Sequence, residues 1–142
     1  MKNLKELEHL AERRQDPSLF NVSRWLKQVS ALLGEVNSGS VESAVAFGTA
    51  FEKLDNGLPR KRARWGAEHY VEVLVVTPRE DTFALEDELA EKVFGPLFAE
   101  SGHLTLYHVW PRQRIHVERQ AKSRFWRDLQ RQAVLLSGEP LW

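Results

Sequence analysis

Apolar residues recur along the chain with two different spacings. In four segments they return every three or four positions, which predicts amphipathic helices over residues 3–14, 23–36, 82–94 and 122–134. In three other segments they form short runs rich in β-branched residues, which predicts strands over residues 41–47, 70–76 and 104–110. Strands separated by helical segments indicate an α+β domain with layered architecture, in which helices cover a small mixed sheet.

The predicted elements divide the chain into two parts. Residues 1–40 are expected to form an N-terminal extension of two helices that packs on the core or on a dimer partner. Residues 41–142 are expected to form the main domain. The whole chain, with 142 residues of which 42% are apolar, is the usual size for a single hydrophobic core. The pair Gly95-Pro96 is expected to stop the third helix, and the stretch 52–66, rich in Gly, Pro and basic residues, is expected to be a loop or an insertion.

Composition narrows the classes of protein and of site. The chain has no Cys, which excludes disulfides and thiolate metal sites, and it has no apolar run long enough to cross a bilayer. The charged N-terminus lacks the apolar stretch of a signal peptide, so we expect a cytoplasmic protein without a membrane partner. The spacing of the histidines matches no recognisable zinc site.

Charge is distributed unevenly, although the formal net charge is zero. Residues 111–131 carry seven Lys or Arg against two acids, whereas residues 81–91 carry five acids and no base. This asymmetry fits the binding of a polyanion, or self-association through opposite patches. Two well-solvated helix faces explain it equally well.

Two positions near the predicted sheet are candidates for chemistry. Gly48 and Thr49 follow the first strand, and a helix beginning there would point free backbone N–H groups at a phosphate; an ordinary tight turn is the alternative. Glu72 lies inside an apolar strand, where an acid is costly to bury unless it is paired or binds a cation. Glu72 is therefore expected at an open end of the sheet or beside a partner, and a charge that protects an edge strand is the alternative.

The order of these motifs resembles the signature of the nucleotidyltransferases related to DNA polymerase beta. In that family a Gly-Ser turn ends the first strand and an Asp-x-Asp pair lies on the second. The matching segments here are Phe47-Gly48-Thr49 and Tyr70-Val71-Glu72. Residues 125–129 and 134–138 are similar to the family's C-terminal segment. From residue 41 to 138 the chain is most similar to the minimal kind of nucleotidyltransferase, which acts as an antitoxin beside a small helical toxin.

The resemblance implies a mechanism, and the sequence departs from it. The family's carboxylates hold two divalent ions, and Glu72 would be the remaining ligand for Mg²⁺ if the protein is active. Tyr70 replaces the first acid, and a phenol with a pKa near 10 is a poor Mg²⁺ ligand at neutral pH. The family's third acid comes from the following strand, but residues 104–110 contain none. We therefore expect a degenerate catalytic motif.

Basic residues and aromatics supply candidate contacts for an anion. The predicted loop between the two motifs contains several cations and an aromatic ring that can stack on a base. These residues are Arg60, Lys61, Arg62, Arg64 and Trp65. On the last predicted helix, Arg124, Arg127 and Arg131 share one face at spacings of three and four. His108 shares a strand face with Leu106 and Trp110 and is expected to be a hydrogen-bonded core histidine.

Three functional hypotheses follow. The leading one is a catalytically degenerate protein of nucleotidyltransferase fold that binds a nucleotide, a nucleic acid or a protein partner at the inherited cleft. The second is an active metal-dependent nucleotidyltransferase that modifies a protein or an RNA, using Glu72 with a further acid such as Glu68 or Glu100. The third is a non-enzymatic module, either a nucleic-acid binder or a scaffold that forms a homodimer through its N-terminal helices.

Overall fold

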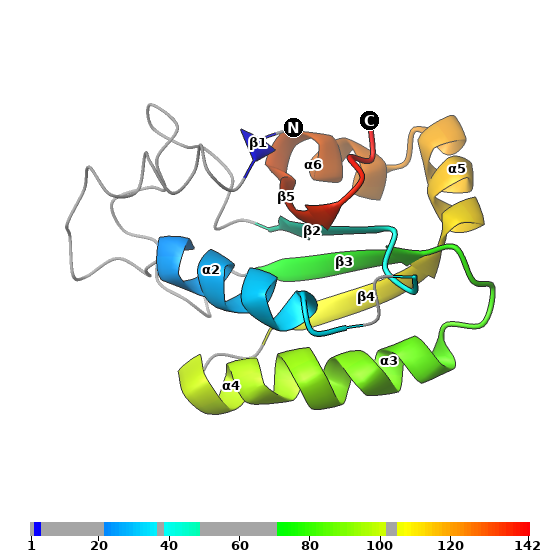
Figure 1. Ribbon diagram of the computed structural model, residues 1–142. Coiled ribbons are helices and arrows are strands. Elements are labelled where there is room, and N and C mark those ends of the chain that lie inside the picture. Colours follow the sequence, from blue (N-terminus) through cyan, green and yellow to red (C-terminus); the bar gives the residue numbers. More distant parts are fainter. Residues whose placement is uncertain (1, 4–21, 37–38, 49–70, 102–104) are drawn as a thin grey trace.

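The computed structural model describes residues 2–3, 22–36, 39–48, 71–101 and 105–142, which form helices on a mixed β-sheet (Figure 1). Within these residues the sheet has five strands in the order β1-β5-β2-β3-β4. The strands are β1 (Lys2–Asn3), β2 (Ser43–Phe47), β3 (Glu72–Thr77), β4 (Leu106–Pro111) and β5 (Val134–Gly138). The β2 strand pairs antiparallel with β3 and β5, whereas the β3–β4 and β1–β5 pairs are parallel. The predicted α+β class with a small mixed sheet is confirmed.

The register of the strands gives the sheet two distinct ends. Phe47 pairs with Glu72, and Glu72 pairs with Leu106, so the last residue of β2 lies beside the first residues of β3 and β4. We call this the open end. At the opposite end, which we call the closed end, Ser43 pairs with Gly138, and Thr77 pairs with Pro111.

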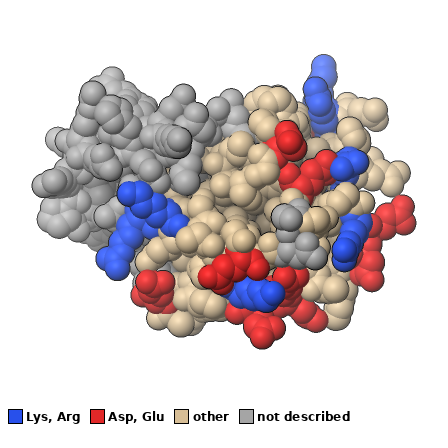
Figure 2. All heavy atoms as spheres, in the orientation of Figure 1, with Lys and Arg blue, Asp and Glu red and all other residues tan. Residues whose placement is uncertain are grey.

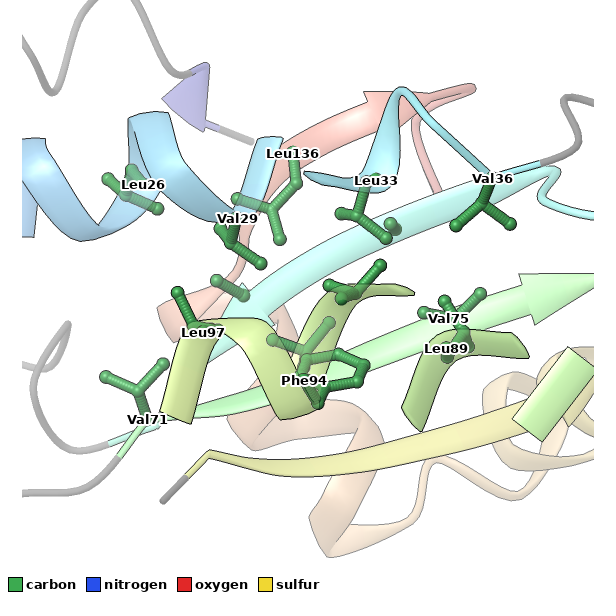
Figure 3. Close-up of a cluster of buried hydrophobic side chains, with 14 of the residues drawn as sticks. Leu26, Val29, Leu33, Val36, Val71, Val75, Leu89, Phe94, Leu97 and Leu136 are labelled. Carbon is green, nitrogen blue, oxygen red and sulfur yellow. The ribbon is translucent and has the colours of Figure 1, made fainter. Parts of the chain in front are cut away.

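One face of the sheet is covered by α2 (Val22–Leu33) and by a long helical segment that consists of α3 (Phe83–Leu89), η2 (Ala90–Phe94) and α4 (Gly95–Ser101). Figure 3 shows aliphatic side chains from these helices meeting side chains of the sheet. Leu26 and Val29 come from α2, whereas Leu89 and Leu97 come from the long segment, and all four are fully buried. This larger core holds the sheet and the two helical elements together.

The other face carries α5 (Arg112–Ala121) and α6 (Arg124–Gln132) over a smaller core that is rich in aromatic residues. The α6 helix begins at Ser123, whose hydroxyl accepts a hydrogen bond from the backbone N–H of Trp126, as expected of an N-cap. Trp126 and Leu129 then point inward and are almost fully buried. The side chains of Glu72 and His108 belong to this aromatic face, because they alternate with residues that enter the aliphatic core.

The helix that was expected to stop at Gly95-Pro96 continues to Ser101, so this prediction was wrong. The N–H of Gly95 reaches back five residues to the carbonyl of Ala90, as in a π-helical turn. A Cβ atom on Gly95 would lie 2.7 Å from that carbonyl oxygen, so glycine permits the turn. Pro96 then occupies the first turn of α4, where a missing N–H costs little. Burial of Val93, Phe94 and Leu97 keeps the two halves aligned.

The structure differs from the predicted elements at further positions. Helix α5 was not predicted, because its hydrophobic pattern is weak, with Ile115 as its buried apolar residue. The last predicted helix ends at Gln132, and residues 134–138 form β5 instead. The described residues show the second of the two predicted N-terminal helices, as α2, so an extension of two helices is not supported. Lys2–Asn3 form the short strand β1, and residues 4–14 lie outside the described residues, as does the predicted loop over residues 52–66.

Candidate functional site

The open end brings together an acid and a histidine from neighbouring parallel strands. Glu72 begins β3, and His108 lies on β4 on the same face of the sheet. The His108 imidazole Nε2 lies 3.1 Å from the Glu72 carboxylate Oε1, at hydrogen-bond distance. The side chain of Glu72 is 18% exposed and that of His108 is 36% exposed, so the pair is accessible from one side.

This hydrogen bond explains how an acid is tolerated in an apolar strand. A mostly buried carboxylate requires a partner, and His108 is that partner. The expectation that Glu72 lies beside a partner is therefore confirmed, and Glu72 is the first residue of its strand. The alternative of an edge-strand charge is wrong, since β3 lies between β2 and β4. His108 is hydrogen bonded as expected, but it is half-buried and lies at the border of the core.

Aromatic rings form the inner wall beside this pair. The ring of Phe125, from α6, lies 5.4 Å from Phe47 and 4.6 Å from Trp110, measured between ring centroids. The His108 ring is 6.2 Å from Phe47 and 6.3 Å from Phe125, and it meets Phe125 edge to face. Such contacts fix the orientation of the imidazole against β2 and α6. Phe125 is partly exposed, whereas Phe47 and Trp110 are buried.

The turn after β2 is held by a side chain from α6. Gly48 has a φ of 128°, a backbone conformation that favours glycine. Its backbone N–H donates a buried hydrogen bond of 3.0 Å to the side-chain oxygen of Gln132. The Gly48 N–H is therefore already occupied, so a phosphate at this turn would take its hydrogen bonds from residues that follow. Thr49 is the next residue and lies outside the described residues.

The remaining predicted site residues divide into two groups. Arg124 and Arg127 are exposed on α6, the helix that also supplies Phe125 and Gln132 to the open end. The basic loop run lies outside the described residues, so it stays a prediction: Arg60, Lys61, Arg62, Arg64 and Trp65. Glu68, proposed as an additional acid, also lies outside them.

Glu100, the other proposed acid, belongs to the opposite side of the sheet. It is exposed on α4, which packs through Leu97 against the aliphatic core. Figure 1 shows α4 and α6 on opposite faces of the sheet. Because the Glu72 side chain lies on the α6 side, Glu100 and Glu72 are not brought together.

The resemblance implies that the open end coordinates a pair of Mg²⁺ ions, and its side-chain donors can be compared with that requirement. Paired Mg²⁺ ions require several hard oxygen ligands in tight octahedral geometry. Across the described ranges, no three His, Asp or Glu side chains lie close enough to hold a metal ion. At this end the described residues offer one carboxylate, bonded to an imidazole and walled by aromatic rings. These residues do not fit the two-ion site implied by the resemblance.

Two hydrogen bonds at the open end were not predicted from the sequence: His108 with Glu72, and Gln132 with Gly48. The pairing of His108 with Glu72 follows from residue alternation combined with the parallel register of β3 and β4, and the register is a tertiary fact. Gln132 was missed because a polar residue at the end of a helix usually faces water, whereas this one is 7% exposed.

Membrane insertion has no support from the helices that the structure describes. Each is too short or too polar to cross a bilayer. Comparison with known proteins gave no further guide to identity: no protein-family model, no curated protein and no solved structure shows significant similarity to the chain.

Proposed function

We propose that this chain is a protein of nucleotidyltransferase-like design that binds a nucleotide at the open end of its sheet without carrying out two-metal transfer. The observation that supports it best is the hydrogen bond between Glu72 and His108 beside the Gly48 turn. Three segments far apart in the sequence meet there, at the end of β2 and the beginnings of β3 and β4.

The chemistry of the open end supports a planar, hydrogen-bonding ligand. The half-exposed ring of His108 and the partly exposed ring of Phe125 are faces on which a base can stack. The second oxygen of Glu72 can accept a hydrogen bond from an exocyclic amino group of a base.

The same pair argues against metal-dependent transfer. In the related family the following strand supplies the third acid, and here that strand is β4, which places His108 beside Glu72. The hydrogen bond to the imidazole stabilises the Glu72 side chain without a cation. Glu72 is thus a base-contacting residue in this proposal, and Mg²⁺ is not needed for binding.

Titration with ATP, GTP, CTP and UTP, with and without Mg²⁺, tests this proposal through Trp fluorescence. Trp110 lies next to Phe125, so a ligand at the open end changes its emission. We expect saturable binding that does not require Mg²⁺ and that weakens at least about tenfold in His108→Ala and in Glu72→Gln, which corresponds to ~1.4 kcal/mol. Glu42→Gln, which removes an acid from the closed end, is the matched control and should leave affinity unchanged.

The proposal is wrong if no nucleotide binds, if binding requires Mg²⁺, or if His108→Ala and Glu72→Gln bind nucleotides as tightly as the unchanged chain. A second candidate, an active transferase, draws on the same hydrogen bond, because an imidazole oriented by a carboxylate can accept a proton from an acceptor hydroxyl. That enzyme would transfer label from an α-labelled nucleotide to a protein or an RNA, and Glu72→Gln would abolish the transfer. Under the proposal we expect no transfer with any of the four nucleotides and either Mg²⁺ or Mn²⁺.

A further inference from the structure

The fold places the two charged segments of the chain on opposite faces of the sheet. The acidic one includes the long helical segment from α3 to α4, and Figure 2 shows acidic side chains gathered along the lower edge of the molecule, over α3 and α4. The basic one includes α5 and α6, which cover the aromatic face. The sequence left open whether these charges lie together, and the structure separates them by the thickness of the domain.

Most cations of the α5–α6 surface lack an acidic partner. Arg112 pairs with Glu42, and Arg131 pairs with Asp128. Within the described part of the chain, no ion pair is formed by five others, all of them exposed: Arg114, Arg119, Lys122, Arg124 and Arg127. Arg114 instead places its guanidinium over the ring of Trp110, 4.0 Å from the centroid. Across α5, α6 and the turn between them, seven Lys or Arg side chains are present against two acids, Glu118 and Asp128, so these helices carry a positive potential that attracts an anion.

The α6 helix connects this surface to the open end. Its inward side chains include Phe125, which contacts His108, and its last residue, Gln132, holds Gly48. Arg124 and Arg127 are exposed on the outer side of the same helix. The helix that carries these exposed arginines is therefore the one that borders the Glu72–His108 pair.

We propose that the α5–α6 surface binds a single-stranded polynucleotide whose terminal base enters the open end. The inference rests on the proposed function for that base, and it adds the class of ligand. Helices of ten and nine residues are roughly 15 and 14 Å long, so cations spread over both and over the turn between them cannot all reach one triphosphate. A chain of phosphates can contact them in succession.

The composition of the surface fits phosphates and argues against a membrane. Four of the five unpaired cations are arginines, whose planar fork matches the oxygens of a phosphate. An anionic membrane would call for several exposed apolar side chains beside the cations, and on the described α5 and α6 the exposed large apolar residue is Val117. An acidic protein is the alternative ligand, and competition with polyglutamate distinguishes it from a polynucleotide.

The test measures fluorescence anisotropy of labelled twelve-nucleotide oligo-U and oligo-dT with the whole chain at ~50 to 200 mM salt. Each phosphate contact on a single strand adds about −0.7 to the slope of log affinity against log salt. We expect a steep slope, reduced by roughly 1.4 in Arg124→Gln/Arg127→Gln, with affinity about tenfold weaker at low salt. The control, Lys27→Gln/Lys92→Gln, removes the same charge from the helices of the opposite face and should leave the slope unchanged.

Lys122 offers a variant that cannot be confused with unfolding. It has a φ of 49° at the end of α5, a left-handed conformation in which glycine is favoured. Lys122→Gly should raise Tm by a few degrees and yet weaken oligonucleotide binding about threefold. A purely structural role for Lys122 predicts unchanged binding.

Three outcomes overturn the inference: no oligonucleotide binding, loss of binding in both double variants alike, or equal competition by polyglutamate, which would indicate a general binder of acidic polymers. Binding of either oligo-U or oligo-dT supports the inference. If nucleotides fail to bind and His108→Ala binds oligonucleotides normally, the proposed nucleotide site at the open end is wrong. The placement of the terminal base of the polynucleotide at the open end is then wrong as well. If nucleotides bind at the open end and oligonucleotides do not, this inference fails alone.

Discussion

Each end of the sheet carries a glutamate, and the two carboxylates differ in their partners and in how many of their oxygens are hydrogen bonded. At the closed end, Glu42 holds Arg112 through both carboxylate oxygens, at 2.8 and 2.6 Å, which raises the pKa of the Arg112 guanidinium through this hydrogen bond and the negative charge. At the open end, Glu72 meets an imidazole through one oxygen. The pair with Arg112 engages both oxygens of Glu42, whereas the hydrogen bond to His108 engages one oxygen of Glu72.

The backbone shows the same contrast. The N–H of Glu42 donates to the carbonyl of Val76, and the carbonyl of Glu42 accepts from the N–H of Glu139, so this residue joins β2, β3 and the segment after β5. At the open end the turn at Gly48 relies on a side chain, Gln132. Backbone hydrogen bonds hold the closed end together, whereas a side-chain hydrogen bond holds the turn at the open end.

The largest expected effect comes from breaking the closed end at Gly138. A Cβ atom there would lie 2.2 Å from the carbonyl oxygen of Glu42, and the φ of 78° disfavours any side chain. We expect Gly138→Ala to lower the free energy of unfolding by about 3 kcal/mol, measured by urea denaturation. Gly34→Ala is the matched control: its Cβ would lie 3.3 Å from the nearest carbonyl oxygen, so we expect a change within about 0.5 kcal/mol. Equal effects of the two substitutions would contradict the close approach.

A smaller loss is expected at the open end from Gln132→Ala. The substitution leaves the buried N–H of Gly48 without its acceptor, which costs about 2 kcal/mol in the free energy of unfolding. Gln130→Ala, at an exposed position on the same helix, should be nearly neutral. Amide hydrogen exchange at Gly48 provides the direct measurement, because protection should fall in the first variant and persist in the second. Unchanged protection in Gln132→Ala would contradict the hydrogen bond.

The smallest changes in stability, and the sharpest contrast, are expected from the two glutamates themselves. Both belong to partly exposed pairs, so Glu42→Gln and Glu72→Gln should each lower Tm by no more than about 4 °C. Nucleotide affinity should fall in Glu72→Gln and stay constant in Glu42→Gln, as measured by Trp fluorescence. If both variants bind equally well, the two ends do not differ in function.

Local pattern predicted much of the fold but little of its connectivity. The β-branched run that became β3 and the stripe of α2 were correctly predicted, because burial against a sheet imposes its period on the sequence. Strand β5 was missed because residues 134–138 directly continue a helical segment, and their pairing with β2 involves residues about ninety positions away. The π-helical passage at Gly95-Pro96 was missed because tertiary packing overrode two residues that usually end helices.

The candidate site shows the same division. Alternation along one strand singled out Glu72 and required a partner for it, because an unpaired buried carboxylate is costly whatever the fold. The partner was not predictable, since His108 meets Glu72 through the parallel pairing of β3 with β4, and sequence spacing does not encode that register.

The amino-acid sequence by itself determined an α+β domain, its principal strands and helices, and an acid that demands an explanation, because these depend on local periodicity and on the cost of burying charge. Tertiary structure alone decided that the acid meets a histidine, that a glutamine holds the glycine turn, and that the acidic and basic helices lie on opposite faces. Those outcomes depend on strand order and register, which are set by packing among residues distant in the chain.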